Sequence, residues 1–515
     1  MSFRAAVSYS ERFQFGWDKM ESFFNKYLNT IRKTETILYT GHVTAVRGLV
    51  IESNGPRSVI GEICTIRIPS TGAGVLAEVT GFEGNTVRLM PYADTTGIEI
   101  GCEVTASGHI LQAPVGKKLL GRVIDATGAP IDGKGPLETT EFYPVLASPP
   151  DPMTRLPIDR RIVTGVRCID SLLTCGKGQR LGIFAGSGVG KSTLLSMIAR
   201  NTNADVNVIG LIGERNREVS DFIERDLGEE GMKRSVVIVA TSDTPSICRL
   251  RAAYVTTAVA EYFRDQGKDV MLMMDNMTRF AHAQREIGLS TGESPAQRGY
   301  PPSVFDMIPK LLERAGTSDR GSITAFYNVL VDGDDMDEPI TDKVRGTLDG
   351  HIVLSRALSQ QRHYPAIDVL KSISRLARRV SGRETLRAVT KISRLIAIYE
   401  DNRDMISAGV YQKGMNAETD LAIEKHDAIE EFLCQEEDEP CAIEDTLQKL
   451  SALAGIEIPE EEFAENPAAS RKTVAQLVHE HKEENVESAN ESASSASDGN
   501  LAPRLSAISD IAGKL

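Results

Sequence analysis

One stretch of the sequence has the residue types and spacing of a phosphate-binding loop. It reads Ala185-Gly186-Ser187-Gly188-Val189-Gly190-Lys191-Ser192, and it lies between an apolar segment at 181–184 and a helical segment at 193–200. Repeated glycines let backbone N–H groups turn toward phosphate oxygens, and the N-terminus of the following helix adds positive potential. Lys191 would reach the outer phosphates, and the Ser192 hydroxyl would hold Mg²⁺. The loop therefore predicts a nucleoside triphosphate site, with Ala185 in place of the usual first glycine.

Two carboxylates follow other apolar segments and suit the same chemistry. Asp275 ends the run 269–275, at the strand edge where ligands of open α/β sheets bind, so we expect it to be the second Mg²⁺ partner. The alternative role for Asp275 is to cap the next turn. Glu214 follows the segment 206–212 and could polarise a water for attack on the γ-phosphate, with Arg215 fixing its orientation. From spacing alone, a surface ion pair explains Glu214 and Arg215 equally well.

These side chains need a scaffold that brings several strand ends together. Apolar strand candidates at 181–184, 206–212, 235–240 and 270–274 alternate with longer helical stretches from about 106 to 385. This alternation is typical of a parallel sheet wrapped by helices, which is an α/β fold. The carboxyl ends of parallel strands share one edge, so the predicted site lies at that edge.

The rest of the chain divides into four further regions. Residues 1–35 place Trp17, Met20, Phe24, Tyr27 and Ile31 on one face of a helix, which covers the same chain or docks a partner protein. Residues 36–105 show short alternating runs with Gly turns and predict a small β-barrel. Residues 386–465 keep helical period, and residues 466–515 form an acidic Ser/Glu-rich tail that we expect to be mobile.

Composition limits the classes of function. Of 515 residues, 58 are Lys or Arg and 72 are Asp or Glu, giving a net charge of −14 that disfavours nucleic-acid binding. No apolar run approaches the length of a membrane helix, and the N-terminus does not resemble a secretory signal. The seven cysteines form no CxxC pair, so we expect reduced, mostly buried thiols in a cytosolic protein.

Several long motifs, in order, resemble those of the flagellar protein-export ATPases, which are relatives of the catalytic subunit of rotary ATP synthases. The resemblance covers residues 36 to about 465. It rests on GRVIDATGAPIDGKGPL from 121, FAGSGVGKSTLL from 184, LIGERNREV from 211, DNMTRFAHAQREIG from 275, RGYPPSVFDMIPKLLERAG from 298, VLVDGDDMDEPITDKVRGTLDGHIVLSR from 329 and HYPAIDVLKSISR from 363.

The resemblance implies a RecA-like P-loop ATPase core with an N-terminal β-barrel and a C-terminal helical domain, assembled as a homohexamer that hydrolyses ATP with Mg²⁺ at subunit interfaces. By position, Glu214 resembles the catalytic glutamate, and Arg215 and Arg279 its supporting charges. Tyr364 resembles the aromatic on which adenine stacks, and Arg375 the arginine given to the neighbour's γ-phosphate. Taken without the motif, Tyr364 is a core aromatic and Arg375 a solvated helix-face base.

The resemblance also implies partners and a location. They are a regulator or stator protein that the N-terminal helix binds, a central stalk protein, an export gate, and export substrates with their chaperones, at the cytoplasmic face of the inner membrane at the flagellar base. The acidic stretch around 430–439 is either a solvated face or a dock for basic partners. Short helices in the tail, at 475–479 and 505–511, bind a partner or nothing.

Four related functions are alternatives to flagellar export. Non-catalytic ring subunits of rotary synthases typically carry glutamine where this chain has Glu214, and an RNA translocase with this core would show basic and aromatic features in 36–105 that are lacking. The injectisome ATPase of virulence-type secretion shares nearly every motif, and the segments 330–336 and 368–375 favour the flagellar branch. A catalytic subunit of an ion-coupled rotary ATPase is the wider alternative.

Overall fold

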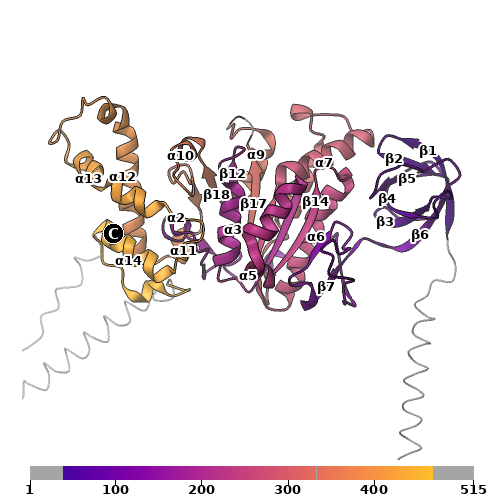
Figure 1. Cartoon of the computed structure of the whole chain (residues 1–515), viewed down its shortest axis with the longest axis horizontal. Coiled ribbons are helices and arrows are strands. Elements are labelled where there is room, and N and C mark those ends of the chain that lie inside the picture. The colour runs from indigo at the N-terminus through magenta and orange to yellow at the C-terminus, as the bar shows by residue number, and fades with distance from the viewer. Residues whose placement is uncertain (1–38, 332, 334, 468–515) are drawn as a thin grey trace, which may run out of the picture.

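The computed structural model describes residues 39–331, 333 and 335–467 as three bodies in line along the long axis (Figure 1). A β-barrel lies at one end, an α/β domain in the centre and a helical domain at the other end. This architecture confirms the predicted fold class. The predicted N-terminal helix of residues 1–35 and the tail beyond residue 467 lie outside the described residues.

The barrel is closed in the strand order β1-β2-β5-β4-β3-β6. Its strands are β1 (Thr40–Arg47), β2 (Val50–Ser53), β3 (Glu62–Arg67), β4 (Gly74–Glu83), β5 (Thr86–Pro91) and β6 (Glu103–Ile110). Inward-facing residues fill the barrel interior with side chains such as Ile51, Ile66 and Leu89. The predicted boundary at residue 105 falls within β6, because pairing with β3 carries that strand to Ile110.

The central sheet has the order β19-β18-β12-β17-β15-β13-β14-β8. All neighbours from β18 to β8 are parallel, whereas β19 at one edge and the short β16 beside β17 are antiparallel. The strands are β8 (Val123–Asp125), β12 (Arg180–Ala185), β13 (Val206–Glu214), β14 (Ser235–Thr241), β15 (Asp269–Asp275), β16 (Gly316–Thr317), β17 (Ser322–Leu330), β18 (Gly350–Leu354) and β19 (Ile373–Ser374). The four predicted strand segments are therefore confirmed.

Helices cover both faces of this sheet, with α6 on one side and α3 on the other. The helices of the central body are α2 (Arg167–Leu172), α3 (Lys191–Asn201), α4 (Asn216–Asp221), α5 (Gly228–Lys233), α6 (Ser246–Asp265), α7 (Met277–Ser290), α8 (Pro302–Leu312), α9 (Pro339–Thr347), α10 (Arg356–Gln360) and α11 (Ala377–Val380). Alternate residues of β13 enter two different cores: Val208 packs with the α6 side, and Ile209 with the α3 side. Burial on both faces explains the continuous apolar runs of the sequence.

Smaller elements complete the central body. Two-stranded sheets join β7 (Gln112–Val115) to β9 (Glu141–Pro144) and β10 (Arg161–Ile162) to β11 (Cys175–Gly176), and a π-helical turn (Phe222–Leu227) separates α4 from α5. Short 3-10 turns lie at Lys117–Leu119, Pro152–Thr154, Gln297–Gly299 and Glu460–Phe463.

The helical domain consists of α12 (Arg383–Ser407), α13 (Ala417–Leu433) and α14 (Ile443–Ala454). Its apolar residues join the same core cluster as the α3 side of the sheet, so the two domains share one continuous core. The predicted boundary at 385/386 falls within the first turn of α12, since this helix begins at Arg383.

The barrel is fixed to the central body by a buried polar contact. Arg251 on α6 donates through Nε to Glu78 Oε2 of β4 at 2.8 Å, and the Tyr92 hydroxyl donates to the same oxygen at 2.6 Å. The Glu78 side chain is 3% exposed. A buried pair that is fully hydrogen-bonded fixes the orientation of its two elements, because breaking it would leave a charge unpaired.

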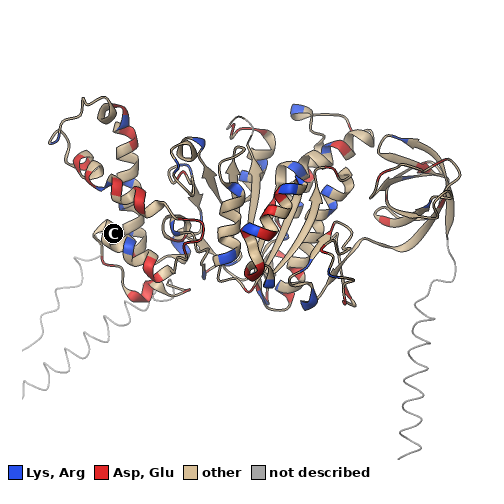
Figure 2. Ribbon diagram, in the orientation of Figure 1, with Lys and Arg blue, Asp and Glu red and all other residues tan. Residues whose placement is uncertain are grey.

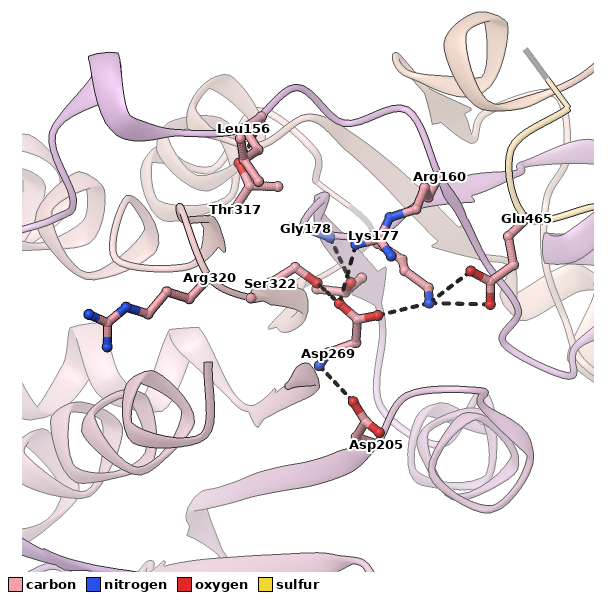
Figure 3. A network of polar contacts seen from close by, with 12 residues as sticks. Leu156, Arg160, Lys177, Gly178, Asp205, Asp269, Thr317, Arg320, Ser322 and Glu465 are labelled. Atoms are coloured by element: carbon pink, nitrogen blue, oxygen red, sulfur yellow. Dashed lines mark hydrogen bonds and ion pairs between the residues drawn. The ribbon is translucent and has the colours of Figure 1, made fainter. Parts of the chain in front are cut away.

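A second charged cluster ties the amino ends of the strands to the C-terminal segment (Figure 3). Lys177 Nζ lies 2.8 Å from Asp269 Oδ2 and 3.2 Å from Glu465 Oε2, and Ser322 donates to the other Asp269 oxygen at 2.7 Å. Although burial opposes it, the bonds from Lys177 and Ser322 hold the pKa of Asp269 below its usual range. This cluster lies at the sheet edge opposite the phosphate loop. Because Lys177, Asp269, Ser322 and Glu465 are all paired within it, we assign the cluster a structural role.

Among the helices that the structure describes, none is long and apolar enough to span a bilayer. The seven cysteines are all free thiols, in keeping with the sequence expectation.

Candidate nucleotide site

The phosphate loop joins β12 to α3, and two of its glycines adopt backbone conformations that favour glycine. Gly188 and Gly190 have φ values of 76° and 93°, a left-handed region that residues with a Cβ rarely adopt. A Cβ at Gly188 would meet nothing within 4 Å, so the loop faces open space there. Gly190 is the N-cap of α3, and no side chain caps this helix. The first N–H groups of α3 are therefore available to an anion, which fits a bound phosphate.

The N-terminus of α3 and the ends of β15 and β13 bring Lys191, Asp275 and Glu214 together. Lys191 Nζ lies 2.5 Å from Asp275 Oδ1 and 3.7 Å from Glu214 Oε1. The three side chains are between 4% and 18% exposed. Burial alone would favour the neutral amine, but the charges of Asp275 and Glu214 outweigh it and raise the pKa of Lys191. The lysine is thus held as a cation at the carboxyl edge of the sheet.

Glu214 is the last residue of β13, one residue after a break in the strand register. The ladder with β14 shifts between Ile212 and Glu214, and Gly213 between them has φ of 72°. A Cβ at Gly213 would lie 2.8 Å from Cβ of Arg279, so both the conformation and the space favour glycine. Burial and then the nearby Asp275 raise the pKa of Glu214 to about 7. A carboxyl group with this pKa can exchange a proton near neutral pH, as a general base must.

Asn276 orients Glu214, a role that the sequence had assigned to Arg215. Asn276 Nδ2 donates to Glu214 Oε1 at 2.7 Å, and its Oδ1 caps α7 by accepting from Arg279 N at 2.8 Å. The sequence signal for this residue was an Asn directly after a strand-ending acid, which is a preferred N-cap type.

The expected placement of Arg215 is not seen. Its side chain is 80% exposed and pairs with Glu218 at 3.2 Å, because Arg215 is the residue before α4 and points along that helix instead of toward Glu214. Arg279 packs its aliphatic part over Gly213 and is likewise exposed. Among the residues that the structure describes, neither the Arg215 nor the Arg279 guanidinium forms a hydrogen bond or ion pair with Glu214.

Tyr364 lies beside the end of the phosphate loop. Atoms of its ring are 3.6 Å from the position of a Cβ at Gly190, and the residue is 44% exposed, so it is not the core aromatic of the alternative interpretation. A cavity of about 730 Å³ opens next to this ring. One side is lined by Arg167, Arg362 and Tyr364, and the other by α13, α14 and the connection between them.

Sequence reasoning missed the helical-domain side of this cavity. It includes Phe432, Cys434 and Gln435, which lie about seventy positions beyond Tyr364 in the sequence and follow no recognisable motif. The lining combines apolar side chains such as Phe432 and Leu453 with the Tyr364 ring and several charged or polar side chains. An aromatic face beside polar groups suits the flat, hydrogen-bonding base of a nucleotide.

Arg375 is not brought to Lys191 within the same chain. It follows β19 at the sheet edge, its backbone N donates to Asp349 O at 3.1 Å, and its side chain is exposed. On the part of the chain that the structure describes, its guanidinium has no hydrogen bond or ion pair. This placement leaves Arg375 free to reach another chain.

Two residues fit Mg²⁺, with phosphate oxygens completing the ligands. Ser192 is exposed in the first turn of α3, and Asp275 ends the neighbouring strand. Among the described residues there is no group of three or more His, Cys, Asp or Glu side chains that could hold a metal by itself. This donor set suits Mg²⁺, which proteins usually bind through one or two side chains together with substrate phosphates.

Together, the glycine loop on a parallel sheet, the lysine and the two strand-end acids define the class of P-loop ATPases. Family models agree along the chain: the β-barrel domain of the ATP synthase alpha/beta family matches residues 43–108, its nucleotide-binding domain 165–374, and the T3SS EscN ATPase C-terminal domain 381–452.

The chain belongs to the ATP synthase alpha/beta family and, within it, to the flagellar and type III secretion ATPases. It is 58% identical to the flagellum-specific ATP synthase of Treponema pallidum, over 84% of this chain and 97% of that one. It is 48% identical to the type 3 secretion system ATPase of Xanthomonas euvesicatoria, over 80% and 93%. The assembled ATPase EscN of enteropathogenic E. coli, also solved with its central stalk EscO, shares 43% identity with TM-scores of 0.77 and 0.75, covering 80% of this chain and all of that one.

Proposed function

We propose that this chain hydrolyses ATP with Mg²⁺ and thereby powers or primes protein export through the flagellar type III apparatus. The observation that carries the proposal is the convergence of Lys191, Asp275 and Glu214 beside the uncapped N-terminus of α3, in a chain 58% identical to a flagellum-specific relative. A cationic lysine, a metal-binding acid and a base of raised pKa are the parts that phosphoryl transfer requires.

Each part has a distinct task. The loop N–H groups and Lys191 bind the outer phosphates. Ser192 and Asp275 would hold Mg²⁺, which would supply neutralisation of the phosphate charge. Glu214, oriented by Asn276, takes the proton of a water whose oxygen attacks the γ-phosphorus. The bond from that phosphorus to the bridging oxygen breaks, and ADP leaves with the electron pair.

The site is completed by a second chain. Arg375 is exposed and unpaired among the described contacts, and we infer that it enters the neighbouring protomer's site in a homohexamer, where it stabilises the negative charge of the transition state. The assembled state of EscN supports the ring, and the EscN–EscO complex supports a central stalk partner. Tyr364 provides the surface on which adenine stacks.

Further partners follow from the same assignment: a regulator or stator, an export gate, and export substrates with their chaperones. The location that suits them is the cytoplasmic face of the inner membrane at the flagellar base, where the protein would associate peripherally. Injectisome secretion is the second candidate function, because a secretion ATPase is 48% identical over 80% of this chain. The higher identity of the flagellar relative favours motility. An ion-coupled rotary ATPase is the more distant alternative.

The test replaces the native gene with a Lys191→Ala copy. We expect the purified variant to release no phosphate from ATP above background, and the cells to lose flagellar filaments while the protein is still made. Intact filaments together with failed secretion of virulence effectors would assign the chain to an injectisome. Normal phosphate release by the variant would contradict the ATPase site itself.

A further inference from the structure

The cavity beside Tyr364 has walls from two domains that are joined there only by non-covalent contacts. The ATPase domain contributes Tyr364 and Arg167, and the helical domain contributes the end of α13 and the connection between α13 and α14. We call residues 434–439 of that connection the hinge segment. The width of the cavity depends on how the hinge segment is held against Tyr364.

The side chain of Arg167, at the start of α2, binds the hinge segment through hydrogen bonds and an ion pair. Its Nη1 donates to Cys434 O at 2.9 Å and to Phe432 O at 3.2 Å, and its Nη2 pairs with the Glu439 carboxylate. The Arg167 side chain is 5% exposed. A buried guanidinium that spans two carbonyls and a carboxylate imposes one geometry on the segment it binds.

Gln435 uses its side chain and its backbone to hold the same junction. Its backbone N donates to Tyr364 O at 2.9 Å, and its Oε1 accepts from Arg167 N at 2.8 Å. Its Nε2 donates to Gly165 O at 2.9 Å and to Glu439 O at 3.0 Å. Gln435 is 4% exposed, so all of these bonds are shielded from water. A shielded amide with donors and acceptor satisfied has no alternative orientation of equal energy.

Two more contacts stabilise the hinge segment and the end of α13 that precedes it. Arg200 of α3, the helix that starts at the phosphate loop, donates to Glu437 O at 2.8 Å. His363, next to Tyr364, lies 3.4 Å from Glu430 of α13. Arg200 therefore holds the hinge segment on the helix of the phosphate loop, and His363 holds the end of α13 beside Tyr364.

We propose that Arg167 and Gln435 are positioning residues that hold the hinge segment against Tyr364, so that the cavity keeps the width that a nucleotide base requires. This inference rests on the proposed ATPase function. It adds that base binding and docking of the helical domain are coupled. Because such coupling is reciprocal, a bound base stabilises the docked helical domain as much as docking favours the base.

The phosphate-binding groups do not share these contacts, which allows a selective test. ADP fills both the base cavity and the phosphate loop, whereas pyrophosphate fills only the loop. In the full-length protein with Mg²⁺, we expect Gln435→Ala to raise the Kd for ADP about tenfold, the effect of losing one or two buried hydrogen bonds, and to leave the Kd for pyrophosphate unchanged. Calorimetric titration measures both constants.

Arg167→Lys is the second variant, because it keeps the charge but cannot donate to two carbonyls and a carboxylate at once. We expect it to raise KM for ATP with kcat within about twofold, since the chemical groups stay in place. Arg161→Lys is the matched control. Arg161 is also buried and also joins the ATPase domain to the C-terminal segment, through Glu462 O at 3.3 Å, but it does not line the cavity. Its ADP affinity should equal that of the unaltered protein.

An unchanged Kd for ADP in Gln435→Ala would overturn the proposal, and so would an equal rise for ADP and pyrophosphate, which would indicate general loosening. Thermal unfolding midpoints of the three variants establish that each is folded. The proposed function fails separately: in that case the unaltered protein releases no phosphate from ATP, while the comparison of ADP with pyrophosphate still decides the role of Arg167 and Gln435.

Discussion

Glu214 shows how single residues acquire a function from their neighbours. The same carboxylate on a surface loop would titrate near its usual value, but here burial and Asp275 raise its pKa to about 7 while Lys191 opposes the shift. Asn276 fixes its direction with a bond of 2.7 Å. In the mechanism that we propose, this places the carboxylate and the lysine near the positions and protonation states that phosphoryl transfer needs.

The raised pKa of Glu214 predicts how activity depends on pH. A base must be deprotonated to take a proton from water, so kcat/KM should fall about tenfold per pH unit below about pH 7 and level off above it. Because kcat/KM reports on the free enzyme, its acid limb measures the pKa of Glu214. Steady-state phosphate release between about pH 5.5 and pH 8.5 provides the profile.

The variant Glu214→Gln should lower kcat by a factor of about 10² to 10⁴ and should lose the acid limb, because the amide cannot accept the proton. Glu230→Gln is the control, since Glu230 is 86% exposed and pairs only with the neighbouring Lys233. A profile for the unaltered enzyme that stays flat across neutral pH would show that another group acts as the base.

At the scale of elements, the start of α12 depends on a residue that follows it by about eighty positions. Glu462 accepts hydrogen bonds from Glu384 N at 2.9 Å, from Thr385 N at 2.8 Å and from the Thr385 hydroxyl at 2.7 Å. A Cβ at Gly382 would lie 1.9 Å from Glu462 Cδ, so glycine is required for this approach. A carboxylate at a helix N-terminus satisfies free N–H groups and interacts favourably with the helix dipole.

Removing this cap should destabilise the protein. We expect Glu462→Ala to reduce the free energy of unfolding by about 1–2 kcal/mol, measured by urea unfolding followed by circular dichroism. The adjacent Glu461 is exposed, so Glu461→Ala should stay within about 0.5 kcal/mol of the unaltered protein. Equal losses in the two variants would mean that the cap contributes nothing specific.

At the scale of the whole molecule, the acidic residues of the helical domain have two different environments. Acidic residues lie on all three helices of the helical domain (Figure 2). The stretch around 430–439 was expected to be either solvated or a dock for basic partners. Glu439 is used within the chain, where it pairs with the buried Arg167. Asp438 lies 3.1 Å from Arg200, but its side chain is 91% exposed and therefore solvated. Glu431 and Glu436 stay exposed.

Arg375 follows β19, which pairs with the start of β18 at the sheet edge opposite the phosphate loop. If Arg375 acts in the neighbouring protomer's site, as we propose, activity is a property of the assembly. Glu214→Gln chains retain Arg375, and Arg375→Ala chains retain Glu214, so each variant alone should be nearly inactive. In an equimolar mixture of the two, about a quarter of the interfaces regain both groups if chains assemble at random, and that fraction of activity should return. Phosphate release measured before and after mixing tests this.

An absence of recovery after mixing, with assembly confirmed by light scattering, would contradict a shared site. Full activity of Arg375→Ala as an isolated monomer would do the same. Wild-type chains diluted below the concentration at which they assemble should lose activity and provide the control.

The sequence by itself determined the parts of the site whose geometry depends on residues adjacent in the chain. Gly188, Gly190, Lys191 and Ser192 follow one another, and a strand, a glycine turn and a helix fix their geometry with few outside contacts. Asp275 was also predictable, because an acid that ends a buried parallel strand must lie at the ligand edge of the sheet.

Only the tertiary structure decided the remaining parts, since they depend on which elements become neighbours. The sequence could not reveal that Arg215 turns outward to Glu218, that Asn276 takes its place, or that Gln435 closes the cavity beside Tyr364. Hydrogen bonds between residues far apart in the sequence leave no periodic signal, because their spacing is set by the path of the folded chain and not by helix or strand repeats.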